Sequence, residues 1–413
     1  MLPVACLLWG LMLLAAPHAD TPAATAGHMI HGTVTLAGGE VVTGFIRQED
    51  DDACWDHLFE ARRRESPWTD LIDMDALARE RRAAYFASHG LLDRLAYTLE
   101  GGDRQDPGGR QFICRYVDLA VLDIDRELEV VTATMADGST HELREGSRDL
   151  GGDLVLGGED GRTVDWDDVL RVEFFPAPSG ADPGVVRIWG ELATADGAFA
   201  GWVRWDRSEF LTTDILDGDE ANTDHEIPMG DIAAIARVNS RSCRVTLTDG
   251  RELVLSGSND VNEDNRGIIM ETAAYGRAVA DWKTFRRLDF RVPPKEHGPV
   301  VPFTESTRLT ATVTTIDGAV HTGNLVLDLD EGWAWEILDG HHGGIEYEIP
   351  LGNITAIEKD ADGVCTVTTR DGSRLTMSTG QDTGPDNRGI LVLGDGEPAQ
   401  VAWSQVAVIR FAR

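Results

Sequence analysis

The sequence predicts an all-β protein built from three divergent copies of a unit of about 110 residues. Residues 249–268 read DGRELVLSGSNDVNEDNRGI and residues 371–390 read DGSRLTMSTGQDTGPDNRGI, so one pattern recurs after 122 residues (382 − 260 = 122). Short runs of alternating apolar and polar residues flank Asp-Gly pairs, which is typical of β-hairpins because the turn needs positive φ. A register held over the length of a unit indicates an internal duplication.

A more divergent copy precedes these two. Trp166 lies at the place that Trp282 and Trp403 occupy in the later copies, near the end of each unit. Segments rich in proline and glycine, which end strands and permit turns, separate the copies. The expected units are residues 29–176, 185–293 and 306–413.

Each unit also reads as two similar halves. Both halves contain a strand, an Asp-Gly turn, a second strand, an acidic loop and a closing apolar run. Halves of about 50 residues with four or five short strands fit a small SH3-like or Sm-like barrel, or part of a larger sandwich. Barrels of this size bury little apolar surface, so we expect neighbouring halves to share a core.

The first unit contains an insertion, about residues 57–110, that we expect to be α-helical. Leu71, Met74 and Leu77 keep helical spacing, and an aspartate at position 73 or 75 is placed to cap the helix. The insertion is rich in arginine. Its arginines either dock an acidic partner or pair with acidic faces of the same molecule, and the second arrangement is the commoner one.

The chain begins with a predicted signal peptide, residues 1–26. Residues 2–16 are almost wholly apolar but too short for a stable membrane span, and residues 24–26 fit the A-x-A cleavage pattern. We therefore expect a secreted or periplasmic protein that is not an integral membrane protein after cleavage. Lys and Arg number 37 and Asp and Glu 71, a formal charge of −34. Such a field repels phosphate backbones, so nucleic acid is excluded as a partner.

An acidic loop in the second and third units has two interpretations. Residues 260–267 place oxygen-bearing side chains at alternate positions before a glycine, as calcium-binding loops do. Ca²⁺ is then the cofactor, and its ligands are Asp260, Asn262, Asp264, Asp382 and Asp386. The commoner alternative is an Asx turn in which arginine pairs with a neighbouring carboxylate. That structural loop consists of Asn265, Arg266, Gly267, Asn387, Arg388 and Gly389.

Tryptophans shared by the units are expected in the core, whereas those without a counterpart are candidates for stacking on a ligand. The unshared ones are Trp202, Trp205, Trp333 and Trp335. Cys54 and Cys114 are unique to the first unit, and whether they form a disulfide in an oxidising compartment is open. Cys243 and Cys365 recur at one position and are expected to be buried free thiols.

The sequence contains no nucleophile elbow, phosphate-binding loop, dinucleotide fingerprint, zinc-protease motif or Cys-x-x-Cys pair. No catalytic residue is therefore assigned. We expect a non-catalytic secreted or envelope protein that presents a binding or scaffold surface to a protein or glycan, with calcium as a stabiliser. The alternative is a hydrolase whose acidic residues lie at the seam between the repeats.

Overall fold

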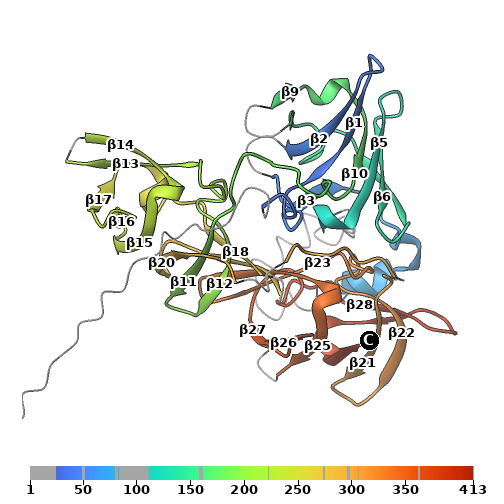
Figure 1. The fold of residues 1–413 in the computed structure, drawn as a ribbon. Helices are drawn as coiled ribbons and strands as arrows, with labels where there is room; N and C mark the ends of the chain where they lie inside the picture. The colour runs from blue at the N-terminus through green and yellow to red at the C-terminus, as the bar shows by residue number, and fades with distance from the viewer. Residues whose placement is uncertain are drawn as a thin grey trace, which may run out of the picture.

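The described residues form thirty strands in four sheets, so the all-β prediction is confirmed. The strands gather into three groups along the chain, drawn blue to green, green to yellow and orange to red in Figure 1. The computed structural model describes residues 25–48, 52–79, 82, 111–157, 161–221, 223–272, 275–294, 298–305, 307–360 and 363–412.

The first group forms an eight-stranded sheet and a separate hairpin of β3 and β4. Its elements are β1 (His31–Leu36), β2 (Val41–Gln48), β3 (Leu58–Arg62), η1 (Thr69–Leu71), β4 (Gln111–Arg115), η2 (Tyr116–Asp118), β5 (Leu119–Asp125), β6 (Val130–Met135), β7 (Thr140–Arg144), β8 (Leu154–Leu156), β9 (Arg162–Val164), η3 (Trp166–Asp168) and β10 (Val169–Phe174). The order across the sheet is β7-β6-β5-β10-β1-β2-β8-β9.

The second group supplies ten strands of a twelve-stranded sheet. Its elements are β11 (Trp189–Thr194), β12 (Ala198–Arg204), β13 (Ile215–Glu220), β14 (Thr223–Pro228), η4 (Met229–Asp231), β15 (Ile232–Asn239), β16 (Ser242–Leu247), β17 (Glu252–Ser256), η5 (Asn259–Val261), β18 (Ile268–Thr272), β19 (Gly276–Ala280) and β20 (Phe285–Arg291). The order is β14-β13-β17-β16-β15-β20-β11-β12-β18-β19-β24-β23, so the last two strands come from the third group.

The third group completes this sheet and forms another of eight strands. Its elements are β21 (Thr310–Thr315), β22 (Val320–Val326), β23 (Ile337–His342), β24 (Ile345–Pro350), η6 (Leu351–Asn353), β25 (Ile354–Lys359), β26 (Cys365–Thr369), β27 (Arg374–Met377), β28 (Ile390–Leu393), β29 (Ala399–Val401), η7 (Trp403–Gln405) and β30 (Val406–Phe411). The order β27-β26-β25-β30-β21-β22-β28-β29 is that of the first sheet with every label raised by twenty.

Asp-Gly pairs close the corresponding hairpin in each group, β6–β7, β16–β17 and β26–β27. The glycines take φ of 84°, 88° and 90°, which a residue with a Cβ adopts only with strain. The aspartate before each glycine accepts the backbone N–H two residues on, at 2.8–3.0 Å. The hairpin turns are thus set by local sequence.

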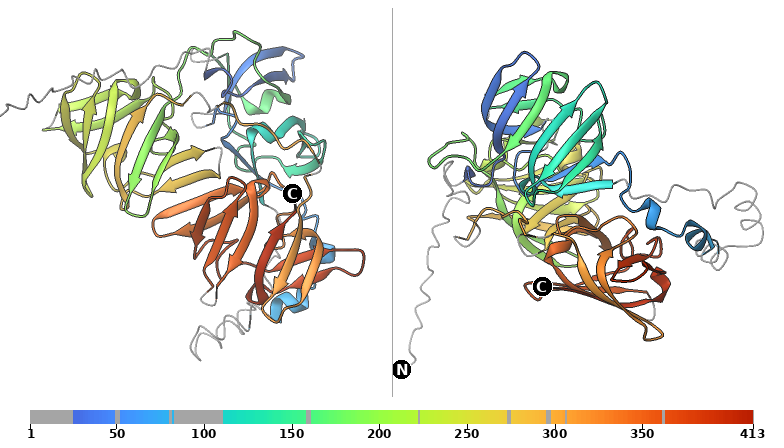
Figure 2. Two further views of the ribbon diagram at one scale, coloured as in Figure 1. Left: turned by 60° about the horizontal axis from the view of Figure 1, so that its bottom comes forward. Right: turned by 90° about the vertical axis from the view of Figure 1, so that its right-hand side faces the viewer.

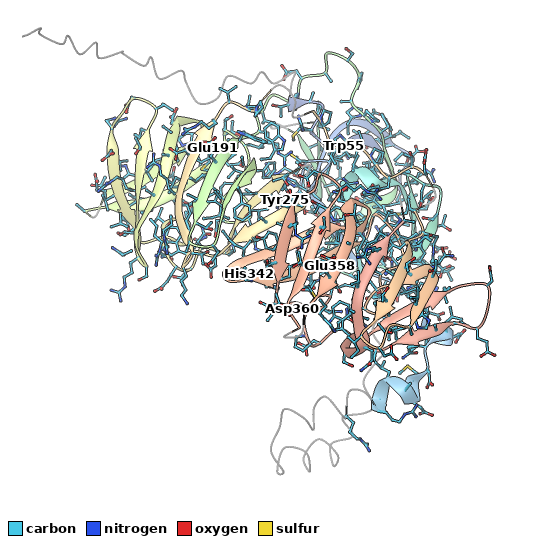
Figure 3. All side chains as sticks on the ribbon, turned by 90° about the horizontal axis from the view of Figure 1, so that it is seen from below. Trp55, Glu191, Tyr275, His342, Glu358 and Asp360 are labelled. Atoms are coloured by element: carbon cyan, nitrogen blue, oxygen red, sulfur yellow. The ribbon has the colours of Figure 1, made fainter. Side chains whose placement is uncertain are left out.

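Backbone hydrogen bonds join the second and third groups, because β19 pairs antiparallel with β24. The gold strands of the second group continue directly into the orange strands of the third in Figure 2. Gly276 begins β19 at φ 96°, and a Cβ there would lie 2.5 Å from the Glu348 carbonyl oxygen. Tyr275, labelled in Figure 3, meets Tyr347 edge-on with ring centroids 6.4 Å apart. One apolar core accordingly runs through both groups.

Aromatic side chains fill the junction between the first and third groups. Trp335 is fully buried, and its ring centroid lies 5.2 Å from that of Phe112 and 5.1 Å from that of His141. Trp68 packs on Trp333 at 5.1 Å. The core of the first group therefore extends into the third, and neighbouring groups share their cores.

The predicted insertion, residues 57–110, begins later than expected, because β3 already occupies its first residues and pairs with β4. The turn η1 and helical residues 74–79 follow. Asp73 Oδ1 accepts the Ala76 N–H at 2.9 Å and caps this helix. Residues 80–81 and 83–110, where the rest of the predicted helix falls, lie outside the described residues.

None of the helices in the described part of the chain has both the length and the apolar character needed to cross a membrane.

Replacing Trp335 by alanine will destabilise the whole chain, because it leaves a cavity where the first and third groups meet. The expected loss is about 3–5 kcal/mol, as for other buried aromatic truncations. Urea unfolding of the full chain measures it, with Val41→Ala, at a side chain 60% exposed, as the control. Equal midpoints for the two variants would show that this junction adds nothing to stability.

Candidate acidic site at the junction of the three groups

Three aspartates occupy corresponding places in the three groups. Each accepts a hydrogen bond at one carboxylate oxygen from the backbone N–H of the third residue in the third strand of its group. The pairs are Asp149 with Glu60 at 2.6 Å, Asp260 with Asp217 at 2.8 Å, and Asp382 with Asp339 at 2.7 Å. Each group therefore holds a carboxylate against the backbone of its third strand.

In the second group Asp206 and Glu209 join Asp260. One carboxylate oxygen from each of the three residues lies within 4.8 Å of the other two. Asp206 follows β12, is fully buried and takes φ 47°, in the left-handed region that aspartate tolerates better than most residues. We call these three residues the second-group acid cluster.

The third group repeats this arrangement with Asp328, Glu331 and Asp382, whose oxygens also lie within 4.8 Å of one another. Each residue is 122 positions beyond its counterpart (206 + 122 = 328, 209 + 122 = 331, 260 + 122 = 382). Asp328 again has φ 47°. All three side chains are buried, with exposed fractions of 0%, 8% and 3%. We call them the third-group acid cluster.

The Asn-Arg-Gly loop holds the first aspartate of each cluster. Arg388 donates from Nε and a terminal nitrogen to Asp328 at 2.9 and 2.6 Å, and its backbone N–H bonds the same carboxylate. Arg266 holds Asp206 from its backbone N–H and Nε at 2.5 and 2.9 Å. The asparagine before each arginine accepts the N–H of the glycine after it, at 3.0 and 2.8 Å. This is the arrangement of the Asx-turn interpretation.

The ligand set predicted for a calcium loop does not assemble. Asp264 and Asp386 are exposed, and the Asn262 side chain accepts the Asp264 backbone N–H at 2.6 Å within its own turn. Asp260 and Asp382 instead point inward to carboxylates more than fifty positions earlier (260 − 206 = 54). Sequence reasoning missed those partners, although Asp-x-x-Glu recurs at 206–209 and 328–331.

Burial raises the pKa of Glu209, Asp260, Glu331 and Asp382, and neighbouring carboxylates raise it further. The pKa of Glu209 is raised to about 8 and that of Asp260 to about 6. The pKa values of Glu331 and Asp382 lie well above the usual range for the same reasons. A raised pKa means that these carboxyls take up a proton, or a cation in its place, more readily than exposed ones.

A cleft of about 250 Å³ opens beside the third-group acid cluster. Glu60 and Arg148 of the first group and Arg207 of the second line it together with residues of the third. Seven of its lining residues are acidic and two are arginines, a formal charge of 2 − 7 = −5. The acidic residues are Glu60, Glu331, Glu336, Asp339, Glu346, Glu348 and Asp382.

A second buried network, nearer the second group, is almost balanced in charge. Its ion pairs are Arg187 with Asp56 and Glu271, Arg204 with Asp52, and Arg277 with Glu271 and Glu348. Three arginines thus face four carboxylates, beside the buried His57. Burial favours the neutral carboxyl, but the nearby cations outweigh it and hold the pKa of Asp52 and Asp56 below their usual range.

The four tryptophans predicted to stack on a ligand are buried, which corrects that prediction. Trp202 and Trp205 are 5% and 0% exposed, and Trp333 and Trp335 are 9% and 0% exposed. The last two pack against His141 of the first group, so these two aromatics mark a contact between groups.

Cys54 and Cys114 are both free and buried, and they belong to different apolar clusters, so the structure contains no disulfide between them. One donor atom each of Cys54, Asp56 and His57 lies within 4.8 Å of the others. Arg187 already pairs with Asp56 at 2.9 Å, and burial raises the pKa of the Cys54 thiol. This trio is therefore a poor metal site, since a metal binds the thiolate.

We compared the chain with protein-family models, curated proteins and solved structures, and none of them matches it.

The chain in EDTA will lose stability as the pH rises from about 5 to about 8. Because folding raises the pKa of Asp260 to about 6 and of Glu209 to about 8, it favours the protonated carboxyls. Their contribution is complete below the unfolded pKa near 4 and is lost as the pH passes the folded values. We expect a loss on the order of 2 kcal/mol, reduced in Glu209→Gln. Urea unfolding across this pH range tests it, and equal slopes for both proteins would contradict it.

Proposed function

We propose that the chain is an exported, non-catalytic β-repeat protein that binds a basic segment of a partner protein in the acidic cleft. The observation that carries the proposal is the excess of acidic side chains in the lining where the three groups meet, seven against two arginines. A concave surface of one sign concentrates counter-charges, and carboxylates form strong charge-assisted hydrogen bonds with lysine and arginine. A neutral glycan would gain little from such a lining.

The rigidity of the junction supports this proposal. The cleft lies between groups that share a backbone ladder and buried ion pairs, among them Arg277 with Glu348 at 3.5 Å. Arg207 of the second group also reaches Glu346 in the cleft at 3.6 Å. A preformed site loses little conformational entropy when a ligand binds, so more of the contact energy appears as affinity.

We propose that each group is one repeat unit, 29–176, 185–293 or 306–413, made of two SH3-like halves that exchange strands. In the order of the twelve-stranded sheet, β13 to β17 are neighbours, as are β11, β12, β18, β19 and β20. The short helices η2, η4 and η6 precede β5, β15 and β25, while η3 and η7 precede β10 and β30. In chain order β5, β15 and β25 are the fifth strands of their groups, and β10 and β30 are the tenth strands of theirs. A short helix before the last strand of a five-strand half is the feature that suggests SH3-like halves.

Signal cleavage should fall before the predicted position. Residues 1–24 lie outside the described residues, but Thr25 and Ala26 are 0% and 5% exposed, and Ala26 belongs to an apolar cluster. We expect amino-terminal sequencing of the exported protein to place the mature end at or before residue 25. A mature end beyond Ala26, or retention in the cytosol, would contradict the proposal.

Fluorescein-labelled decalysine tests the cleft. The double variant Glu60→Gln, Glu346→Gln removes two charges from the lining and should weaken binding about tenfold. Glu191→Gln, Glu358→Gln is the matched control, because these glutamates, labelled in Figure 3, lie on β11 and β25 and are absent from the cleft lining. Fluorescence anisotropy at physiological salt gives both affinities. Equal weakening in the two variants would mean that decalysine reads only the overall charge.

A hydrolase is the second candidate, because Glu331 and Asp382 bring two carboxyls with raised pKa within 4.8 Å of each other beside the cleft. Glycosidases use a protonated carboxyl and a carboxylate in similar proximity. A panel of polysaccharides, assayed for new reducing ends, distinguishes the candidates. Turnover that disappears in Asp382→Asn would replace the non-catalytic proposal.

A further inference from the structure

The third-group acid cluster lies in a region where buried carboxyl groups outnumber buried arginines. The five carboxyls there are at most 8% exposed, and they face two arginines that are at most 9% exposed. The formal charge is 2 − 5 = −3, and counting the half-buried Arg308 leaves 3 − 5 = −2. The residues counted are Asp328, Asp330, Glu331, Glu336 and Asp382 against Arg63 and Arg388. Buried charge of this size needs protons or a cation.

Three of the five carboxyls are already paired. Asp328 accepts the bonds of Arg388 described above, and Glu336 pairs with Arg63. Asp330 lies between the two arginines, 3.5 Å from Arg63 and 3.4 Å from Arg388. Each carboxylate oxygen has two lone pairs, so an oxygen of Asp328 that accepts from arginine can also coordinate an ion. Arg388 would then orient that ligand.

The remaining two carboxyls, Glu331 and Asp382, carry the uncompensated charge. Glu331 Oε2 is buried and has no hydrogen-bond partner among the described residues. Asp382 Oδ2 accepts the Asp339 backbone N–H at 2.7 Å. Both residues also line the cleft, from which water or an ion can enter. An unpartnered buried oxygen beside two further carboxylates is a vacant ligand position in chemical terms.

The spacing of the three oxygens fits a large, hard cation. Calcium–oxygen distances of about 2.3–2.6 Å allow ligands on opposite sides of the ion to lie up to about 5 Å apart. The cluster oxygens lie within 4.8 Å of one another. Magnesium draws its ligands closer, and soft metals prefer sulfur or imidazole donors, which this cluster lacks. The cleft leaves room for the waters that complete a calcium shell.

We propose that Asp328, Glu331 and Asp382 bind one divalent cation of the Ca²⁺ type at the inner wall of the cleft. The inference rests on the proposed function of this cleft as a site for positive charge, and it needs no partner protein. The ion neutralises the two unpaired carboxyls and fixes the loop after β22 to the loop after β27, each of which supplies ligands.

The second-group acid cluster provides an internal comparison. Glu209 Oε2 likewise has no hydrogen-bond partner among the described residues, but Glu209 is only partly buried. Ser208 stands where the third group has Asp330, so this cluster has one carboxylate fewer beside it. Because calcium affinity depends on the number of charged ligands and neighbours, the second-group cluster should bind more weakly.

Isothermal titration of the full chain, stripped with EDTA, with CaCl₂ tests the site. We expect one tight site, an unfolding midpoint that rises with calcium, and proton release on binding, seen as an enthalpy that depends on the buffer. Glu331→Gln and Asp382→Asn should each weaken the tight site at least about tenfold, whereas Glu209→Gln should leave it unchanged. The amides keep the shape and remove repulsion, so both variants should fold.

Absence of calcium binding at millimolar concentration, or binding that Glu331→Gln and Asp382→Asn leave unchanged, would overturn the proposed site. Equal loss in Glu209→Gln would also overturn it. Decalysine binding measured in EDTA separates the two proposals. If decalysine binding depends on the cleft but no calcium site is found, only the partner proposal stands. If a calcium site is found but decalysine does not bind in the cleft, only the ion proposal stands.

Discussion

The guanidinium of Arg63 is the point on which the junction of the first and third groups depends. It lies 2% exposed, pairs with Glu336, and sits over the rings of Phe112 and Trp333 at 5.3 and 5.5 Å. A buried charge is tolerated only when charged and polar partners surround it, so this single cation requires the first and third groups to stay together. One of its partners, Glu336, also lines the cleft, so the ion pair that joins the two groups lies at the cleft wall.

The two buried polar networks contain the same residue types but differ in their charge balance. Around Arg187 and Arg277 each carboxylate faces an arginine, and the pKa of the nearby Asp52 falls. Around Glu331 and Asp382 the arginines are already engaged by other carboxylates, and the pKa rises. The balance of arginines and carboxylates therefore separates a network that holds the fold together from one that has capacity for a cation.

Local features of the fold could be predicted from the sequence, while contacts between groups could not. The Asp-Gly turns and the Asn-Arg-Gly loops depend on residues adjacent in the chain. Asp206 and Asp260 meet only because the loops after β12 and β17 pack together. The position of one in the sequence therefore does not predict the other as its neighbour. Trp335 has no counterpart in the second unit, which suggests a ligand surface, whereas its partners Phe112 and His141 belong to the first group.

Because β19 pairs with β24, β19 is not an exposed edge strand of its sheet. β19 reads GRAVA, and its residues from Arg277 to Ala280 are buried where β24 covers them. A second group released from the third would expose this apolar strand with unsatisfied backbone donors and acceptors, a template for pairing with another copy. Joining the groups in one chain thus acts as protection against aggregation, since the strand is paired within the molecule.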